Sequence, residues 1–157
     1  EQLPRWTDAA ERVIHVDFHT GLGPWATYKL LTARPDSDAA TGKLRGWFGP
    51  TVESCRTGPT AYDTRGGIDE WLEDSLARRE CYSLCAEFGT YGPLAVLSAL
   101  RAENQAHHWG GDDPAILRPA KARLKEVFAP ASRDWRRRVV QQGVDLVRKA
   151  VDVCFAP

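Results

Sequence analysis

Residues 13–24 read Val-Ile-His-Val-Asp-Phe-His-Thr-Gly-Leu-Gly-Pro, and this stretch decides the fold class. Its first six residues are mostly β-branched or aromatic, which is typical of a β-strand. The strand pattern stops at His19, where a loop with two glycines and a proline begins. Alternation along a strand places the apolar side chains on one face and His15, Asp17 and His19 on the other. The sequence therefore predicts a strand that delivers His19 to a glycine-rich loop.

A second strand is predicted to end in the same way. Residues 81–86, Cys-Tyr-Ser-Leu-Cys-Ala, form a mostly apolar run of the kind found in strands that are covered on both faces. The run ends at Glu87, and Gly89 follows. A carboxylate placed beside a buried strand needs a charged partner, hydrogen bonds or a metal. In α/β sheets, ligands bind at the carboxyl ends of the strands, so we expect His19 and Glu87 to lie near each other at one edge of the sheet.

The remaining elements complete an α/β pattern. The order of strands and helices predicts one domain over residues 1–157 with three layers, in which helices cover both faces of a mixed, mainly parallel sheet. A long loop with four glycines is expected at residues 49–67. A capped lead-in helix or turn is expected within residues 1–11, with Thr7 or Asp8 able to serve as its N-cap, and a strand is expected over 27–33. The other expected helices are one capped by Asp36 or Ser37 that runs toward 47–48, and those over 68–76, 93–107 and 132–153.

The last of these helices, which begins at Ser132, has a pronounced apolar pattern. Helical spacing assigns its apolar stripe to Trp135, Val139, Val140, Val144, Val147 and Val151. The arginines at 133 and 136–138 are expected to form its solvated face.

Composition and charge exclude several classes of protein. Hydrophobic residues make up 43% and charged residues 27%, which is close to the average for globular domains. Lys and Arg number 21, as do Asp and Glu, so no net field favours nucleic acid or an acidic membrane surface. No apolar run reaches the roughly 20 residues that a membrane helix requires, and no signal peptide is recognisable. We therefore expect a protein without nucleic-acid or membrane partners.

The four cysteines do not have the spacing of a structural zinc site, because no C-x2-C pair occurs. Cys81 and Cys85 share one face of the predicted strand, and free cysteine is among the most buried residue types. Core packing is therefore the favoured interpretation. Free thiols suit a reducing cytoplasm, which is the expected location.

Two motifs carry a resemblance to a known superfamily. Val16-Asp17-Phe18-His19-Thr20-Gly21-Leu22-Gly23-Pro24, followed by Ala86-Glu87-Phe88-Gly89-Thr90, resembles the zinc carboxypeptidase superfamily. The similarity is greatest to its uncharacterised bacterial metallopeptidase-like branch. The aspartoacylase and succinylglutamate desuccinylase amidohydrolases are similar around the strand-end D-x-H-T. The resemblance extends from about residue 13 to residue 107.

The resemblance implies a zinc hydrolase that cleaves a peptide or an N-acyl amino acid amide bond. In that superfamily zinc is held by an H-x-x-E pair and by a later strand-end histidine, which His19 matches. Glu87 matches the general base that takes a proton from the attacking water. A tyrosine on a loop between the two motifs also takes part in catalysis, which makes Tyr62 a candidate, and Arg65 is a candidate for binding a substrate carboxylate.

The chain departs from the superfamily pattern in one large respect. No H-x-x-E occurs in its 157 residues, because the residues three positions after the four histidines are Phe18, Leu22, Gly110 and Gly111. We therefore expect that the chain is the C-terminal part of a longer polypeptide whose missing N-terminal part supplies the first two zinc ligands. The alternative is a non-catalytic domain of the same fold that acts as a binding or structural module. A binding module that uses the aromatic residues Trp25, Trp47 and Trp109 is a third possibility.

Overall fold

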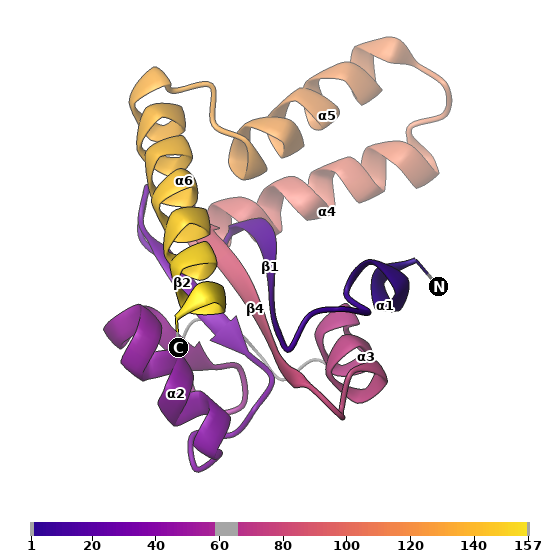
Figure 1. Ribbon diagram of the computed structural model, residues 1–157. Helices are drawn as coiled ribbons and strands as arrows, with labels where there is room; N and C mark the ends of the chain where they lie inside the picture. The colour runs from indigo at the N-terminus through magenta and orange to yellow at the C-terminus, as the bar shows by residue number, and fades with distance from the viewer. Residues whose placement is uncertain (1, 59–65, 157) are drawn as a thin grey trace. The chain divides into compact units, whose positions relative to one another are not determined.

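A computed structural model describes residues 2–58 and 66–156 of the chain. Figure 1 labels its helices and strands. In chain order they are α1 (Leu3–Trp6), β1 (Arg12–Gly21), β2 (Tyr28–Thr32), α2 (Ala39–Phe48), the short 3-10 helix η1 (Gly49–Thr51), β3 (Val52–Ser54), α3 (Ile68–Ser75), β4 (Glu80–Gly89), α4 (Pro93–Trp109), α5 (Pro114–Phe128) and α6 (Arg133–Phe155).

The strands form one mixed sheet in the order β1-β4-β2-β3. β1 and β4 run parallel, because the amide of Glu80 donates to the carbonyl of Glu11 at the start of both strands. β2 runs antiparallel to β4, since the amide of Gly89, at the end of β4, donates to the carbonyl of Thr27, just before β2. β2 and β3 are parallel, with Leu30 opposite Val52. The predicted α/β class and mixed sheet are confirmed.

The chain folds as two compact units. The first comprises Glu1–Phe18, Lys29–Ala86 and Gln142–Pro157, and the second comprises His19–Tyr28 and Glu87–Gln141. The unit boundaries fall within β1, β4 and α6, so these three elements contribute to both units.

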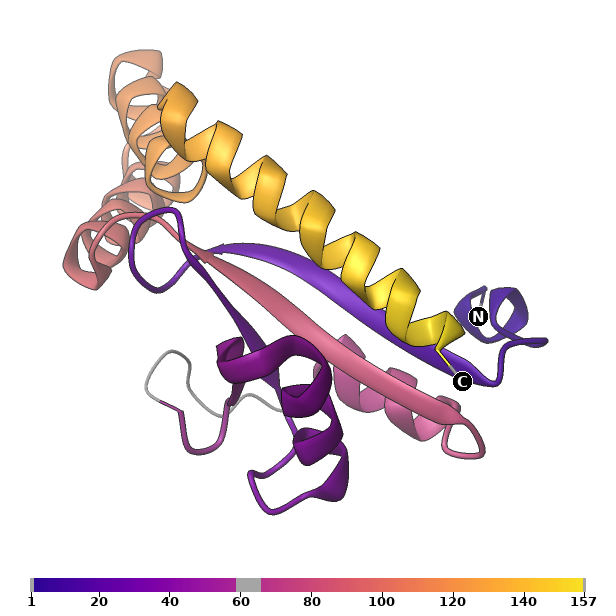
Figure 2. The same ribbon diagram turned by 60° about the vertical axis from the view of Figure 1, so that its left-hand side comes forward.

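In the first unit, helices cover both faces of the strands. On one face, Leu72 and Leu76 of α3 pack against Cys81 of β4 and Val13 of β1. On the other face, Trp47 of α2 stacks edge-on against Tyr82 of β4 with ring centroids 4.9 Å apart. On this second face α6 also runs along β1, where the Arg12 side chain donates to the Val153 carbonyl at 2.7 Å (Figure 2). This arrangement of helix, sheet and helix is the one that the sequence predicts.

Burial explains the state of Cys81 in this unit. Its thiol lies in the apolar cluster under α3, and burial raises its pKa to about 11. A thiol with such a pKa is unreactive at neutral pH. The interpretation of Cys81 as a core-packing residue is consistent with this environment.

Glu80 joins two cations at the start of β4, and this predicts an acid-dependent stability. Its carboxylate accepts from Arg12 and from Lys43, each at 2.7 Å, and these bonds lower its pKa to about 2. A depressed pKa stabilises the folded state above the unfolded-state value near 4.5, and this contribution is lost as pH falls toward 2. Glu80→Gln is therefore expected to lower the free energy of unfolding at pH 6 and to have no effect near pH 2. Urea unfolding across this range measures it, and equal losses at both pH values would contradict the assignment.

The second unit contains the antiparallel pair of helices α4 and α5. The pair is held by a cluster of Val96, Ala99 and Val127, and polar contacts join their surfaces, including Lys121 to Glu103 at 2.7 Å. Trp135 of α6 is also buried in this unit and donates its indole N–H to the Gly89 carbonyl at 2.9 Å. Among the helices in the described part of the chain, none has the length and apolar character needed to cross a membrane.

Several sequence-based expectations about the elements were wrong. The first helix ends at Trp6, so Thr7 and Asp8 follow it and do not cap it. Asp38 caps α2 in place of Asp36 or Ser37, because its carboxylate accepts from the amide of Ala40. The long loop contains the short strand β3. Helix α5 was not anticipated, because Pro119 lies inside it and its apolar pattern is weak.

The apolar stripe assigned to α6 is largely exposed. Trp135 is buried, but four valines of the stripe stand 42 to 64% exposed. The buried face of α6 is formed by Trp135 together with Leu146, Ala150 and Val153, which are outside the predicted stripe. Periodicity identified an apolar row but could not tell which side of the helix the sheet covers.

Candidate metal and catalytic site

His19 and Glu87 come together in the second unit, as the sequence predicts. Each is the third residue from the end of its strand, His19 in β1 and Glu87 in β4. Their side chains point to the same face, and His19 Nδ1 lies 4.0 Å from Glu87 Oε2. The histidine side chain is 54% exposed and the carboxylate only 8%. A buried carboxylate thus lies beside a solvent-facing imidazole at the carboxyl ends of two parallel strands.

Burial makes the Glu87 carboxylate a stronger base than an ordinary glutamate. Desolvation raises its pKa, and this effect is only partly offset by the amide of Leu22, which donates to Oε1 at 2.9 Å, and by the nearby His19. A general base works best when its pKa approaches the working pH. The second carboxylate oxygen, Oε2, faces His19 and remains the one through which Glu87 could accept a proton.

The glycine-rich loop after β1 is held directly against the end of β4. The amide of Ala26 donates to the Gly89 carbonyl at 3.1 Å, and the amide of Gly89 donates to the Thr27 carbonyl at 2.8 Å. Thr90 adds a bond from its hydroxyl to the Gly21 carbonyl at 3.2 Å. The two motifs therefore form one structure in which the E-F-G-T segment fixes the H-T-G-L-G-P loop.

Gly89 permits this close approach because it lacks a side chain. A Cβ atom at position 89 would lie 2.0 Å from the Pro24 carbonyl oxygen, and backbone cannot move aside as a flexible side chain can. Gly89→Ala is therefore expected to lower the free energy of unfolding by about 3 kcal/mol. Gly92→Ala, where no atom lies within 4 Å of the added methyl group, is the matched control in guanidinium unfolding. Equal stabilities of the two variants would contradict this packing.

Gly21 fits the carboxylate side of the site for a related reason. Its φ of +146° is rarely adopted by residues with a side chain, and a Cβ there would approach Phe128 at 3.0 Å and Glu87 Oε1 at 3.6 Å. The loop thus needs glycine for its backbone conformation and for its close approach to the Phe128 ring, while a Cβ would be in ordinary contact with the Glu87 carboxylate.

Aromatic side chains support the same loop. Trp25 packs edge-on against Tyr91, with centroids 5.1 Å apart, and lies 6.4 Å from the ring of Trp135. Trp25 therefore packs within the second unit although it remains 38% exposed. Trp47 is likewise packed in the first unit, whereas Trp109 is 76% exposed. The three tryptophans do not share one role.

A metal ion could be held at this site. Within the described residues, His19 and Glu87 form a possible metal-binding group together with Cys85, which precedes Glu87 by two positions in the same strand. Imidazole, thiolate and carboxylate are all zinc ligands in proteins. Sequence reasoning had assigned Cys85 to the core, although its position two residues before Glu87 was a sufficient signal that it shares the polar face.

The remaining candidate residues are not part of the group formed by His19, Cys85 and Glu87. Tyr62 and Arg65 lie outside the residues that the structure describes. His107 and His108 occupy the last turn of α4, with ring centroids 4.9 Å apart.

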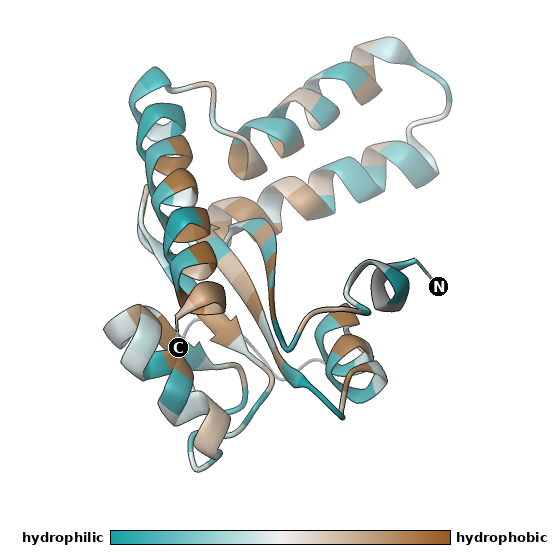
Figure 3. Cartoon of the chain, viewed as in Figure 1, coloured by the Kyte–Doolittle hydropathy of each residue, from teal (hydrophilic) through white to brown (hydrophobic). Residues whose placement is uncertain are grey.

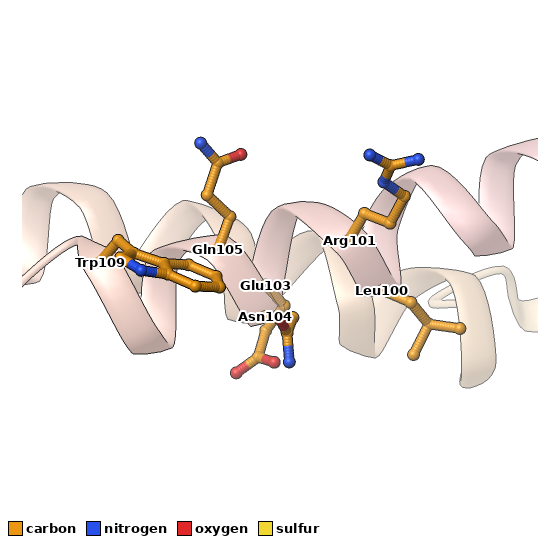
Figure 4. A pocket seen from close by; sticks show the side chains of 6 residues that line it. All are labelled: Leu100, Arg101, Glu103, Asn104, Gln105 and Trp109. Atoms are coloured by element: carbon orange, nitrogen blue, oxygen red, sulfur yellow. The ribbon is translucent and has the colours of Figure 1, made fainter.

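A separate hollow lies on α4 and has no catalytic arrangement. Figure 4 shows that its six lining side chains come from this single helix. They are Leu100, Arg101, Glu103, Asn104, Gln105 and Trp109. Glu103 is already bound to Lys121, which lowers its pKa. The hollow is an open surface, and His19 with Glu87 remains the better candidate site.

Comparison with known proteins gave one match. A family model matches residues 2–142 and thus includes both motifs and most of the chain. Searches of curated proteins and of solved structures gave no match. Because the match extends over far more than half of the chain, the protein belongs to the family described as Protein of unknown function (DUF2817).

Proposed function

We propose that this chain is the C-terminal part of a zinc-dependent hydrolase that cleaves a peptide or N-acyl amino acid amide bond. The observation that carries the proposal is the buried Glu87 carboxylate, whose pKa is raised and whose Oε2 lies 4.0 Å from the strand-end His19. The family to which the chain belongs is associated with the zinc carboxypeptidase-like superfamily, which supports the same conclusion.

The donor set fits zinc but does not complete a catalytic site. Catalytic zinc sites use three protein ligands and leave a fourth position open. In the proposed arrangement His19 is one ligand, and Glu87 stays free to act as the base. An H-x-x-E pair outside these 157 residues would supply the other two ligands. The proposed partner is therefore the N-terminal part of the same polypeptide, and the proposed location is the cytoplasm.

Each residue of the site has a separate task in the proposed reaction. Zinc, when bound, supplies a Lewis acid that polarises a carbonyl and makes a water molecule more acidic. Glu87 accepts the proton of the attacking water at Oε2, because Oε1 is held by the amide of Leu22. The protonated carboxyl group then returns the proton to the leaving amine. His19, held in place by its strand, would be the zinc ligand that this chain supplies.

The zinc content of the chain alone tests this division of roles. With one histidine ligand, the purified 157-residue chain is expected to retain far less than one zinc per molecule after dialysis, as measured by elemental analysis. Stoichiometric zinc would instead show that the chain has a complete ligand set of its own.

If stoichiometric zinc were found, two cysteine variants would identify its ligands. If Cys85→Ser removed such zinc and Cys154→Ser did not, then His19, Cys85 and Glu87 would be the ligands. Glu87 could then no longer be the free base, and the proposed mechanism would be wrong. The longer polypeptide with an upstream H-x-x-E provides a further test. If it folds but binds no zinc, the result favours the alternative, a non-catalytic module.

A further inference from the structure

The helix α6 presents a row of exposed valines to solvent. Their side chains are 42 to 64% exposed, and Phe155, at the end of the helix, is 84% exposed. The row consists of Val140, Val144, Val147 and Val151. Figure 3 shows hydrophobic residues recurring along this helix among hydrophilic ones. The sheet and loops are packed against the other side of α6, so the row is separate from the core.

The spacing of this valine row matches a seam between two helices. Its members are 4, 3 and 4 residues apart, which is the alternation of the a and d positions in a coiled coil. Contiguous apolar rows of this kind on a surface helix mark interaction sites. The spacing reads the same in both directions, so the row is complementary to a copy of itself.

We propose that α6 pairs antiparallel with α6 of a second copy of this chain. A twofold axis midway between Val144 and Val147 places Val144 against Val147 of the partner subunit. The same axis places Val140 against Val151 of the partner subunit. Every valine of the row then meets a valine, as in an isologous interface.

The charges along α6 select the antiparallel arrangement. Arg133, Arg136, Arg137 and Arg138 lie in its first turns, where Asp134 is the only acidic residue. Asp134 pairs with Arg137 and Arg138, which leaves this end of the helix positive. A parallel pair would place the two basic ends side by side. An antiparallel pair instead places each basic end beside the C-terminal part of the other copy, where Arg148 and Lys149 are balanced by Asp145 and Asp152. Asp152 and Phe155 are exposed there, and a carboxylate and an aromatic ring both attract arginine.

Sedimentation equilibrium over a concentration series tests the pairing. The chain is expected to show a reversible monomer–dimer equilibrium, and Val147→Asp is expected to weaken association more than about tenfold. Ile116→Asp on α5 is the matched control, because Ile116 is β-branched and as exposed as Val147, at 48% against 46%. Circular dichroism should show that both variants remain folded. A chain that is monomeric at every concentration, or a dimer that only Ile116→Asp weakens, overturns the proposal.

A charge variant tests the direction of the helices. Asp152→Lys places a cation, in place of a carboxylate, beside the basic end of an antiparallel partner. The variant is therefore expected to associate more weakly than the unaltered chain in low salt. In a parallel pair the same change replaces one like-charge contact with another and has no effect. Dissociation by Val147→Asp without any effect of Asp152→Lys would overturn the antiparallel arrangement.

Discussion

Glu87→Gln, introduced into the longer polypeptide that carries the complete metal site, is expected to lower the rate of hydrolysis by roughly 10²–10⁴-fold while zinc remains bound. Glutamine has nearly the same shape and can still accept from the Leu22 amide through its carbonyl oxygen. It cannot accept a proton from water. The measurement combines turnover of a peptide and of an N-acyl amino acid with zinc determination on the same sample.

The stability of this variant provides an internal control. Burial raises the pKa of Glu87, so the folded state disfavours its charged form. Its contribution to stability therefore falls as pH rises from the unfolded-state value through the higher folded-state value, and at neutral pH the charge is destabilising. Glu87→Gln should consequently unfold at a higher denaturant concentration than the wild type at pH 7. A less stable variant, or one with near-normal turnover, would contradict the role of Glu87 as a buried general base.

His19→Ala is expected to abolish both zinc binding and hydrolysis. The change removes a direct ligand, so the loss of metal affinity should exceed the 10–100-fold loss typical of residues that only support a ligand. Strand geometry makes replacement difficult, because Phe18 and Thr20 point to the opposite face. Zinc titration with a competing chelator measures the affinity.

His15→Ala is the matched control for this experiment. His15 lies on the same face of β1 four residues earlier, where its Nδ1 is 2.7 Å from the Ser83 hydroxyl oxygen in the first unit. It should lose stability but keep zinc. Retention of zinc by His19→Ala would make His19 a structural residue and leave the hydrolase proposal without its metal ligand.

The principal features of the site could be predicted from the sequence because strand alternation is a strict pattern. Two apolar runs, each ending in a polar residue and a glycine-rich turn, were sufficient to place His19 and Glu87 together. The bond from the Leu22 amide to Glu87 could not be predicted, because it depends on the conformation of the loop around Gly21. The inclusion of Cys85 in a possible metal group was also missed, because burial statistics for cysteine outweighed its position on the polar face.

The helices show where periodicity stops being informative. Helix α5 contains Pro119, and its weak apolar pattern did not reveal that Val127 packs against α4. For α6 the pattern was strong but pointed to the wrong face, because the sheet selects the side that carries Leu146 and Val153. Which face of an amphipathic helix is buried depends on neighbours that lie far away in the sequence.

The pairing of β1 with β4 fixes the position of His19 relative to Glu87. Arg12 meets Glu80 and His15 meets Ser83, in each case 68 residues apart, and His19 and Glu87 have the same separation. The ladder between the two strands holds this alignment, so the segment that connects them need not have a fixed length. A change in the length of the segment that links the two strands therefore leaves the histidine and the carboxylate side by side. The register of two strands, and not the path of the chain between them, thus sets the distance between the two proposed functional groups.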